Sequence, residues 1–226
     1  MQCTSSCSTE IVRHNGAVFE TFRVDSVGQI VFGWKSDTES LLKSFEHFEA
    51  HLKEEGRLIF ATNGGMFTPE LNPVGWYVEK GQELHPLNLD SGYGNFYLFP
   101  NGVFGIDQNG EAFVQKVDSS IGLSNPQYAT QSGPMLVIDN ELHPAFRKES
   151  TNTYIRSGVG VNQEGQVVFA ISNEPVNFYT FAELFREKLK CPNALYLDGA
   201  ISKMYNESTG RSEDGEFGVM IGVIEY

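Results

Sequence analysis

Two stretches of the sequence share one pattern, and that pattern limits the folds open to the chain. In each stretch, a segment with apolar residues at helical spacing leads directly into a short apolar run. The run then stops at a polar residue followed by glycine, at Asn63-Gly64-Gly65 in the first stretch and at Asp198-Gly199 in the second. Short apolar runs bounded by such turn residues are typical of buried strands. The sequence therefore predicts two strands that each carry a polar side chain at the carboxyl end.

Each of these strands is preceded by a helical segment and an earlier β-type run, within residues 29–61 and 166–198. Ser36-Asp37-Thr38-Glu39 and Thr180-Phe181-Ala182-Glu183 have the form of a capping box, which marks a helix start. A helix that joins two strands of one sheet implies parallel neighbours and a right-handed crossover. The region between the two units is rich in β-type runs separated by turn residues. We therefore predict an α+β fold: a mixed β-sheet with two strand–helix–strand crossovers and several β-hairpins.

The 226 residues suffice for one large domain, and no linker divides them. We predict a flexible N-terminus over residues 1–10 and a single domain over residues 11–226. The formal net charge of −13 argues against a nucleic-acid ligand, because binding to a phosphate backbone requires clustered basic residues. No apolar run reaches the ~18 to 20 residues of a membrane helix, so no membrane span is expected.

The first nine residues are biased towards Ser, Thr and Cys, as at the flexible start of a processed exported chain. We therefore expect an exported protein. A frayed N-terminus of a cytoplasmic protein is the alternative reading of the same residues.

Asp198 is the first candidate for chemistry. The apolar run that precedes it predicts partial desolvation, which raises the pKa of a carboxyl towards values useful for acid or base catalysis. The alternative is that Asp198 only begins an Asp-Gly turn. Glu174 leaves the neighbouring strand of the same predicted crossover, so we expect it to emerge near Asp198. Two carboxyls at one edge can divide acid and base roles, as in glycoside hydrolysis, although Glu174 also suits a solvated loop.

The remaining candidates are predicted to bind substrate. Arg156 is a guanidinium on an otherwise apolar strand, and it requires either a substrate phosphate or an internal carboxylate. The small residues of Asn63-Gly64-Gly65 and Gln131-Ser132-Gly133 let backbone amides approach an oxyanion, or they form tight turns. Gly199 and Ser202 follow Asp198, and Ser202 either contacts substrate or caps a helix. The sequence has no Walker A loop, no His-Glu-x-x-His and no Rossmann fingerprint, so we predict no cofactor and leave a metal requirement open.

Four motifs occur in a fixed order: Asn63-Gly64-Gly65-Met66-Phe67, Gln131-Ser132-Gly133-Pro134-Met135-Leu136, Arg156-Ser157-Gly158-Val159-Gly160 and Leu197-Asp198-Gly199-Ala200-Ile201-Ser202. Together they resemble the phosphodiester glycosidase family, which includes the enzyme that uncovers mannose 6-phosphate, over roughly residues 55 to 226. Gly94-Asn95-Phe96 and Pro100-Asn101-Gly102 further suggest the bacterial branch, whose members are envelope proteins of the periplasm or cell surface. Many relatives have two glycines in place of Ala200-Ile201, and this departure puts N-acetylglucosamine specificity in doubt.

The resemblance implies hydrolysis of the glycosidic C–O bond of a sugar-1-phosphodiester, which releases free sugar and a phosphomonoester. On this reading the partner is a carbohydrate phosphate, held by Arg156 and backbone amides while Asp198 acts at the sugar. Two alternatives remain open. One is a non-catalytic envelope module that binds glycan or glycan-phosphate, and the other is a metal-assisted phosphodiesterase that cleaves the P–O bond.

Overall fold

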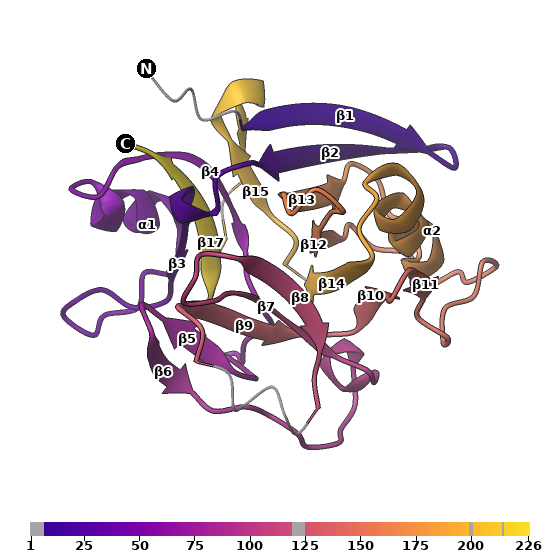
Figure 1. The fold of residues 1–226 in the computed structure, drawn as a ribbon, viewed down its shortest axis with the longest axis horizontal. Coiled ribbons are helices and arrows are strands. Elements are labelled where there is room, and N and C mark those ends of the chain that lie inside the picture. The colour runs from indigo at the N-terminus through magenta and orange to yellow at the C-terminus, as the bar shows by residue number, and fades with distance from the viewer. Residues whose placement is uncertain (1–6, 119–124, 199–200, 214) are drawn as a thin grey trace.

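The computed structural model describes residues 7–118, 125–198, 201–213 and 215–226, and in these ranges strands far outnumber helices (Figure 1). The strands form three sheets. The first sheet is, in spatial order, β1 (Ser8–His14), β2 (Ala17–Val24), β13 (Val167–Ser172), β12 (Ser157–Val161), β14 (Asn193–Asp198), β10 (Met135–Ile138) and β11 (Glu141–Leu142). The second is β16 (Arg211–Ser212), β15 (Met204–Asn206), β4 (Arg57–Asn63), β17 (Met220–Glu225) and β3 (Ile30–Gly33). The third is β6 (Gln82–His85), β5 (Tyr77–Glu79), β9 (Tyr128–Ser132), β7 (Gly102–Ile106) and β8 (Ala112–Lys116).

Every strand pair in the described ranges is antiparallel, which corrects the predicted mixed sheet. Both strand–helix–strand units are present, as β3–α1–β4 and β13–α2–β14. In each unit the two strands run in the same direction but are not neighbours. β17 lies between β3 and β4, and β12 lies between β13 and β14. Strand β17 comes from the other end of the described chain, whereas β12 directly precedes β13 and pairs with it as a hairpin.

The two helices begin at different residues from those predicted. Helix α1 (Phe45–Leu52) is capped by Ser44, whose side chain accepts a hydrogen bond from His47 N at 3.2 Å. The expected cap at Ser36 lies instead in a turn, where Glu39 has a φ of 61°. Helix α2 (Phe178–Glu183) is capped by Asn177, which accepts from Thr180 N at 2.9 Å, and a π-helical turn (Leu184–Lys188) continues it. An asparagine or serine at the N-cap satisfies an otherwise unpaired amide.

One hydrophobic cluster draws on all three sheets, with members such as Phe60 of β4, Phe104 of β7 and Phe169 of β13. Helix α2 covers the outer face of the first sheet, where Phe181 and Phe185 pack on Tyr196 and its neighbours. Helix α1 covers the outer face of the second sheet. Figure 1 shows the two helices on opposite sides of the molecule. The cores on either side of each sheet hold the strand ends in fixed positions.

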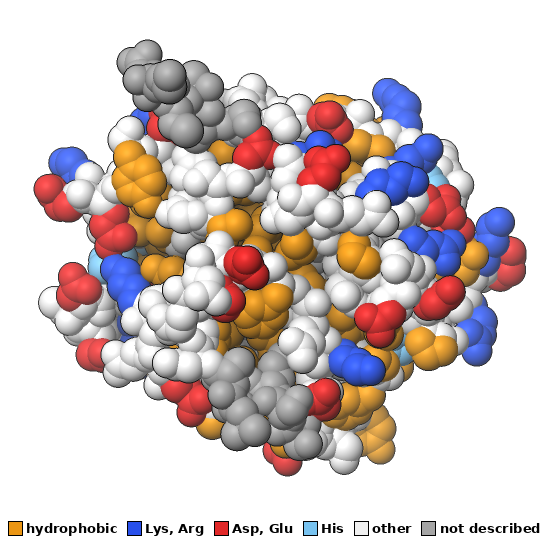
Figure 2. All heavy atoms as spheres, in the orientation of Figure 1, with side chains coloured by type: hydrophobic (Ala, Val, Ile, Leu, Met, Phe, Trp, Pro, Cys, Tyr) orange, Lys and Arg blue, Asp and Glu red, His pale blue; other side chains and the backbone are white. Residues whose placement is uncertain are grey.

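The segment predicted to be flexible, residues 1–10, falls only partly within the described ranges. Residues 1–6 lie outside the described ranges, whereas Ser8–Glu10 form the first part of β1 and pair with β2. On the face shown in Figure 2, acidic and basic side chains are interspersed, with Lys and Arg more numerous on the side of α2. Within the described ranges, neither helix has the length and apolar character that crossing a bilayer requires.

Candidate active site

The polar strand ends predicted from the sequence meet at one rim of the molecule. Strand β4 ends at Asn63, β9 ends at Ser132 and β14 ends at Asp198, while β12 begins at Ser157. In Figure 1 the heads of β9 and β14 lie close together, and a hydrogen bond of 2.8 Å from Ser132 Oγ to Leu197 O joins them. Segments from all three sheets therefore contribute to this rim.

Asn63 connects three of these segments. Its side chain is fully buried, and its Oδ1 accepts hydrogen bonds from Ser157 Oγ and from Lys203 N, both at 3.1 Å. Burying an amide without partners is costly, so this carbonyl oxygen fixes β12 and the segment after Asp198 relative to β4. The role of Asn63 seen here is to assemble the rim.

The backbone around Asp198 is held by serine hydroxyls. Ser132 Oγ donates to the carbonyl of Leu197, and Ser157 Oγ lies 3.2 Å from the carbonyl of Asp198. Ser202 Oγ also donates to the carbonyl of Asp198, in a short hydrogen bond. Ser202 is thus beside Asp198, as the sequence predicts, whereas Gly199 lies outside the described residues. These bonds fix the backbone of β14 at the position where it carries Asp198.

The Asp198 carboxylate lies close enough to Tyr196 for its charge to act on that phenol. Burial raises the pKa of the Tyr196 phenol, the Arg156 guanidinium opposes that rise, and the charge of Asp198 adds to it. The pairing of β14 with β12 has a register shift between Tyr196 and Asp198, and Asp198 is paired with Ser157. Asp198 therefore lies near a buried, protonated phenol.

The glycines of the rim accommodate protein rather than a ligand. A Cβ on Gly64 would lie 2.6 Å from Val219, one on Gly133 would lie 2.7 Å from Phe96 O, and one on Gly65 would overlap Gln131 O. The amides of Gly64 and Gly65 donate to Val219 O at 2.8 Å and to Thr130 Oγ1 at 3.1 Å. These two amides are engaged within the protein, so they are not the oxyanion donors that the sequence suggested.

Gln131 holds a neighbouring loop in place. Its Oε1 accepts from Trp76 N at 2.8 Å and from Asn88 N at 3.0 Å, and its Nε2 donates to Asn88 O at 2.7 Å. The side chain is buried and every one of these partners is backbone. In this structure Gln131 shapes the wall next to Ser132.

Arg156 points to the opposite face of the first sheet from Ser157. Its buried guanidinium donates to Val176 O at 2.8 Å, to Tyr196 Oη at 3.2 Å, and to both the backbone and the side-chain oxygen of Asn152. It also lies 3.7 Å above the ring of Phe178. Burial lowers the pKa of Arg156, although a guanidinium remains charged at neutral pH. The partner that the sequence requires is neither a phosphate nor a carboxylate but a set of neutral acceptors.

Glu174 does not face Asp198. Its Oε1 accepts a hydrogen bond of 2.7 Å from Val18 N, at the start of β2. Strands β13 and β12 lie between β2 and β14, and three strand spacings amount to about 14 Å. The crossover argument assumed that β13 and β14 are neighbours, and the inserted β12 removes that proximity.

Ser157 and Lys203, which both donate to Asn63 Oδ1, were not among the predicted site residues. Ser157 lies within a motif that was recognised, and the period-2 alternation of a strand was the available signal that it faces away from Arg156. Lys203 follows Ser202 directly. Among the described residues, no group of three His, Cys, Asp or Glu side chains is placed to hold a metal ion.

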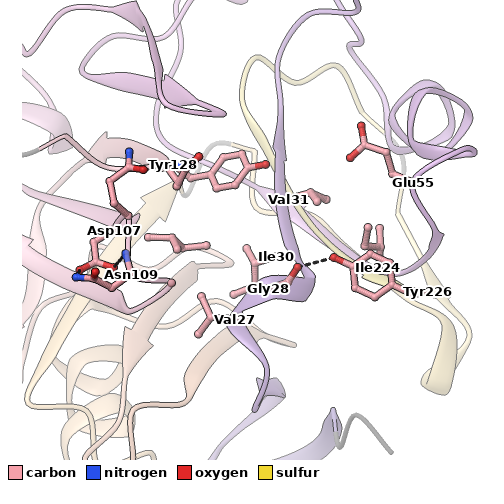
Figure 3. A pocket seen from close by; sticks show the side chains of 14 residues that line it. Val27, Gly28, Ile30, Val31, Glu55, Asp107, Asn109, Tyr128, Ile224 and Tyr226 are labelled. Atoms are coloured by element: carbon pink, nitrogen blue, oxygen red, sulfur yellow. Dashed lines mark hydrogen bonds between the residues drawn. The ribbon is translucent and has the colours of Figure 1, made fainter. Parts of the chain in front are cut away.

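A separate groove of about 350 Å³ lies at the opposite end of the sheets (Figure 3). Tyr128, Asp107 and Asn109 form one wall and Val31, Ile224 and Tyr226 form the other, with Tyr226 Oη donating to Gly28 O at 2.7 Å. On β7, Ile106 borders this groove while Gly102 pairs with Ser132 at the rim, so about 13 Å of strand separates them. None of the predicted site residues that the structure describes lines this groove.

The sequence model of the phosphodiester glycosidase family matches residues 56–223. The uncharacterized protein YigE of Escherichia coli K12 is 39% identical over 156 residues, which is 69% of this chain and 61% of YigE. The chain thus spans less than two thirds of that relative.

Two solved structures share the fold at low sequence identity. The catalytic domain of zebrafish N-acetylglucosamine-1-phosphodiester alpha-N-acetylglucosaminidase, auto-inhibited by its pro-peptide, matches with a TM-score of 0.70 and 13% identity, covering 98% of this chain and 83% of that one. A putative exported protein of Burkholderia pseudomallei matches with a TM-score of 0.59 and 11% identity, covering 92% of this chain and 74% of that one. The family recognised from the four motifs is therefore confirmed, and the chain belongs to the phosphodiester glycosidase family.

Proposed function

We propose that the protein is a hydrolase that cleaves the glycosidic C–O bond of a sugar-1-phosphodiester, releasing free sugar and a phosphomonoester. The observation that carries this proposal is the convergence of Asn63, Ser132, Ser157 and Asp198 at one rim, joined by side-chain hydrogen bonds. Four motifs of one family lie far apart in the chain and meet around Asp198, which is only partly buried. The zebrafish relative by name acts on a sugar-1-phosphodiester, which supports the same class of substrate here.

In this proposal Asp198 is the acid or base that acts at the glycosidic bond. The phosphate cannot be held by Arg156, because that guanidinium is buried against α2 and engaged by neutral acceptors. Lys203 is the better candidate, since it follows Ser202, its backbone is fixed to Asn63, and its ammonium forms no ion pair within the described ranges. Attraction to an ammonium favours a phosphate that carries one negative charge. Export to the bacterial envelope remains part of the proposal, supported by the Burkholderia neighbour described as exported.

The test is turnover of an N-acetylglucosamine-1-phosphodiester panel in oxygen-18 water. Label in the sugar hydroxyl, with loss of turnover by about 10³-fold in Asp198→Asn, is the expected result, because removal of a catalytic acid or base costs rates of this order. Label in the phosphate would show P–O cleavage and identify a phosphodiesterase instead of a glycosidase. Retained ligand binding without turnover in either protein would identify a binding module instead.

A further inference from the structure

Tyr154 is an exposed aromatic residue at the same rim as Asp198. Its side chain is 52% exposed, although its backbone is firmly held. Tyr154 N donates to Val176 O at 3.2 Å, and Tyr154 O accepts from Val176 N at 2.9 Å. The ring is therefore presented to solvent from a fixed backbone.

The buried guanidinium of Arg156 supports this ring, with its central carbon 5.6 Å from the ring centroid. The same guanidinium bonds to the hydroxyl of Tyr196, which lies two residues before Asp198. A tyrosine side chain has few rotatable bonds, so ordering it on binding costs little entropy. An exposed, supported ring of this kind suits stacking against the apolar face of a sugar.

A polar groove of about 310 Å³ lies beside Tyr154, because Thr153, the preceding residue, and Val176, which pairs with Tyr154, both line it. Its polar side chains come from the β1–β2 turn, from the segment before β12, from the loop after β13 and from the start of α2: Asn15, Thr153, Glu174, Asn177 and Thr180. None of the described residues that line it is basic. Val18 N occupies one oxygen of Glu174, and a carboxylate has further acceptor sites for hydroxyl groups. The groove therefore suits a neutral ligand rich in hydroxyls and disfavours phosphate.

The order of the strands sets the distance between this groove and Asp198. Glu174 is bonded to the start of β2, about 14 Å across the sheet from β14. Tyr154 lies between them, because it contacts both Val176 of the groove and Arg156 beside Tyr196. A short oligosaccharide can cover this span in one direction along the rim.

We propose that Tyr154 and the groove at Glu174 form a saccharide subsite that binds neutral sugar rings extending from the reacting sugar phosphate. The placement of the subsite along the substrate rests on the proposed function, whereas its affinity for neutral sugars does not. The natural substrate is then a phosphodiester carried on a glycan rather than a small diester. Glu174 binds substrate hydroxyls in this arrangement instead of sharing the catalytic step.

Binding of neutral tetrasaccharides of glucose, mannose and N-acetylglucosamine to the whole chain tests the subsite directly. We expect at least one to bind in a calorimetric titration, with affinity lowered about tenfold in Tyr154→Ala and retained in Tyr154→Phe. The matched control is Tyr226→Ala, which removes another exposed tyrosine at the opposite groove in Figure 3. Binding by none of the sugars, or equal affinity in Tyr154→Ala and Tyr226→Ala, would overturn the proposal.

Measurements of turnover test the subsite proposal separately from the hydrolase proposal. For a phosphodiester whose sugar carries a neutral oligosaccharide, Tyr154→Ala should lower kcat/KM about tenfold, while turnover of the small diester stays unchanged. Equal losses on both substrates would contradict the subsite. If no diester is cleaved but a tetrasaccharide binds through Tyr154, the hydrolase proposal fails and the subsite stands.

Discussion

Arg156 and Ser157 are adjacent in the sequence, yet they belong to two different polar regions on opposite faces of the first sheet. Arg156 lies on the α2 side, where its donors are engaged by Val176, Asn152 and Tyr196. Ser157 lies on the side of β4, where its hydroxyl shares acceptors with Lys203 and Ser202. The first region is a closed structural centre. The second is a network in which each acceptor has more than one donor, and it surrounds Asp198.

The largest expected effect comes from breaking the closed centre. Arg156→Ala removes a buried guanidinium, leaves Asn152 O without its donor and leaves Val176 O with only the amide of Tyr154, so the free energy of unfolding should fall by about 3 to 5 kcal/mol. Urea unfolding followed by circular dichroism measures this change. The exposed Arg147→Ala serves as the control and should change stability by less than about 0.5 kcal/mol. If Arg156→Ala is as stable as the wild type but binds a phosphodiester more weakly, Arg156 is a substrate-binding residue instead.

The contrast between these neighbours also separates what the sequence could predict from what it could not. Apolar runs ending in a polar residue and glycine located the ends of β4 and β14, because a buried strand must stop where polarity begins. Strand β12, which precedes β13 in a hairpin, also pairs with β14 and so separates the two strands of the second crossover. The prediction that Glu174 lies near Asp198 was therefore wrong. The position of Arg156 on an apolar strand indicated that its guanidinium needs a partner. The sequence did not show which groups supply it. It could not identify backbone carbonyls as that partner, because they leave no mark in the amino-acid pattern.

Glu79, on strand β5 of the third sheet, extends the comparison of polar regions to a largely buried carboxyl. Its side chain accepts a hydrogen bond from the hydroxyl of Tyr77. Burial raises the pKa of Glu79 to about 7, against a lowering by that hydrogen bond. The folded protein therefore binds a proton that the unfolded chain releases near pH 4.5. Stability from this proton is fully present below pH 4.5 and is lost as the pH rises through about 7.

The size of the Glu79 effect is about 2 to 3 kcal/mol between pH 5 and pH 8. Urea unfolding of the wild-type chain and of Glu79→Gln at both pH values isolates it, because the amide cannot ionise and its stability should change less over this range. Glu39→Gln removes an exposed carboxyl and should keep the pH dependence of the wild type. An unchanged pH dependence in Glu79→Gln would show that Glu79 is already ionised at pH 5.

The smallest effect is expected on the Ser157 side, where acceptors are shared. Ser157→Ala should lower the free energy of unfolding by about 1 kcal/mol, because Asn63 Oδ1 keeps the amide of Lys203 and the carbonyl of Asp198 keeps Ser202. The same urea titration measures it, with the exposed Ser40→Ala as a control near zero. A loss as large as that of Arg156→Ala would mean that the rim is a second closed centre. A small loss means instead that the network around Asp198 keeps its geometry when one donor is missing. The serine hydroxyls at the rim can then give up a hydrogen bond within the protein and bind substrate without disturbing the position of Asp198.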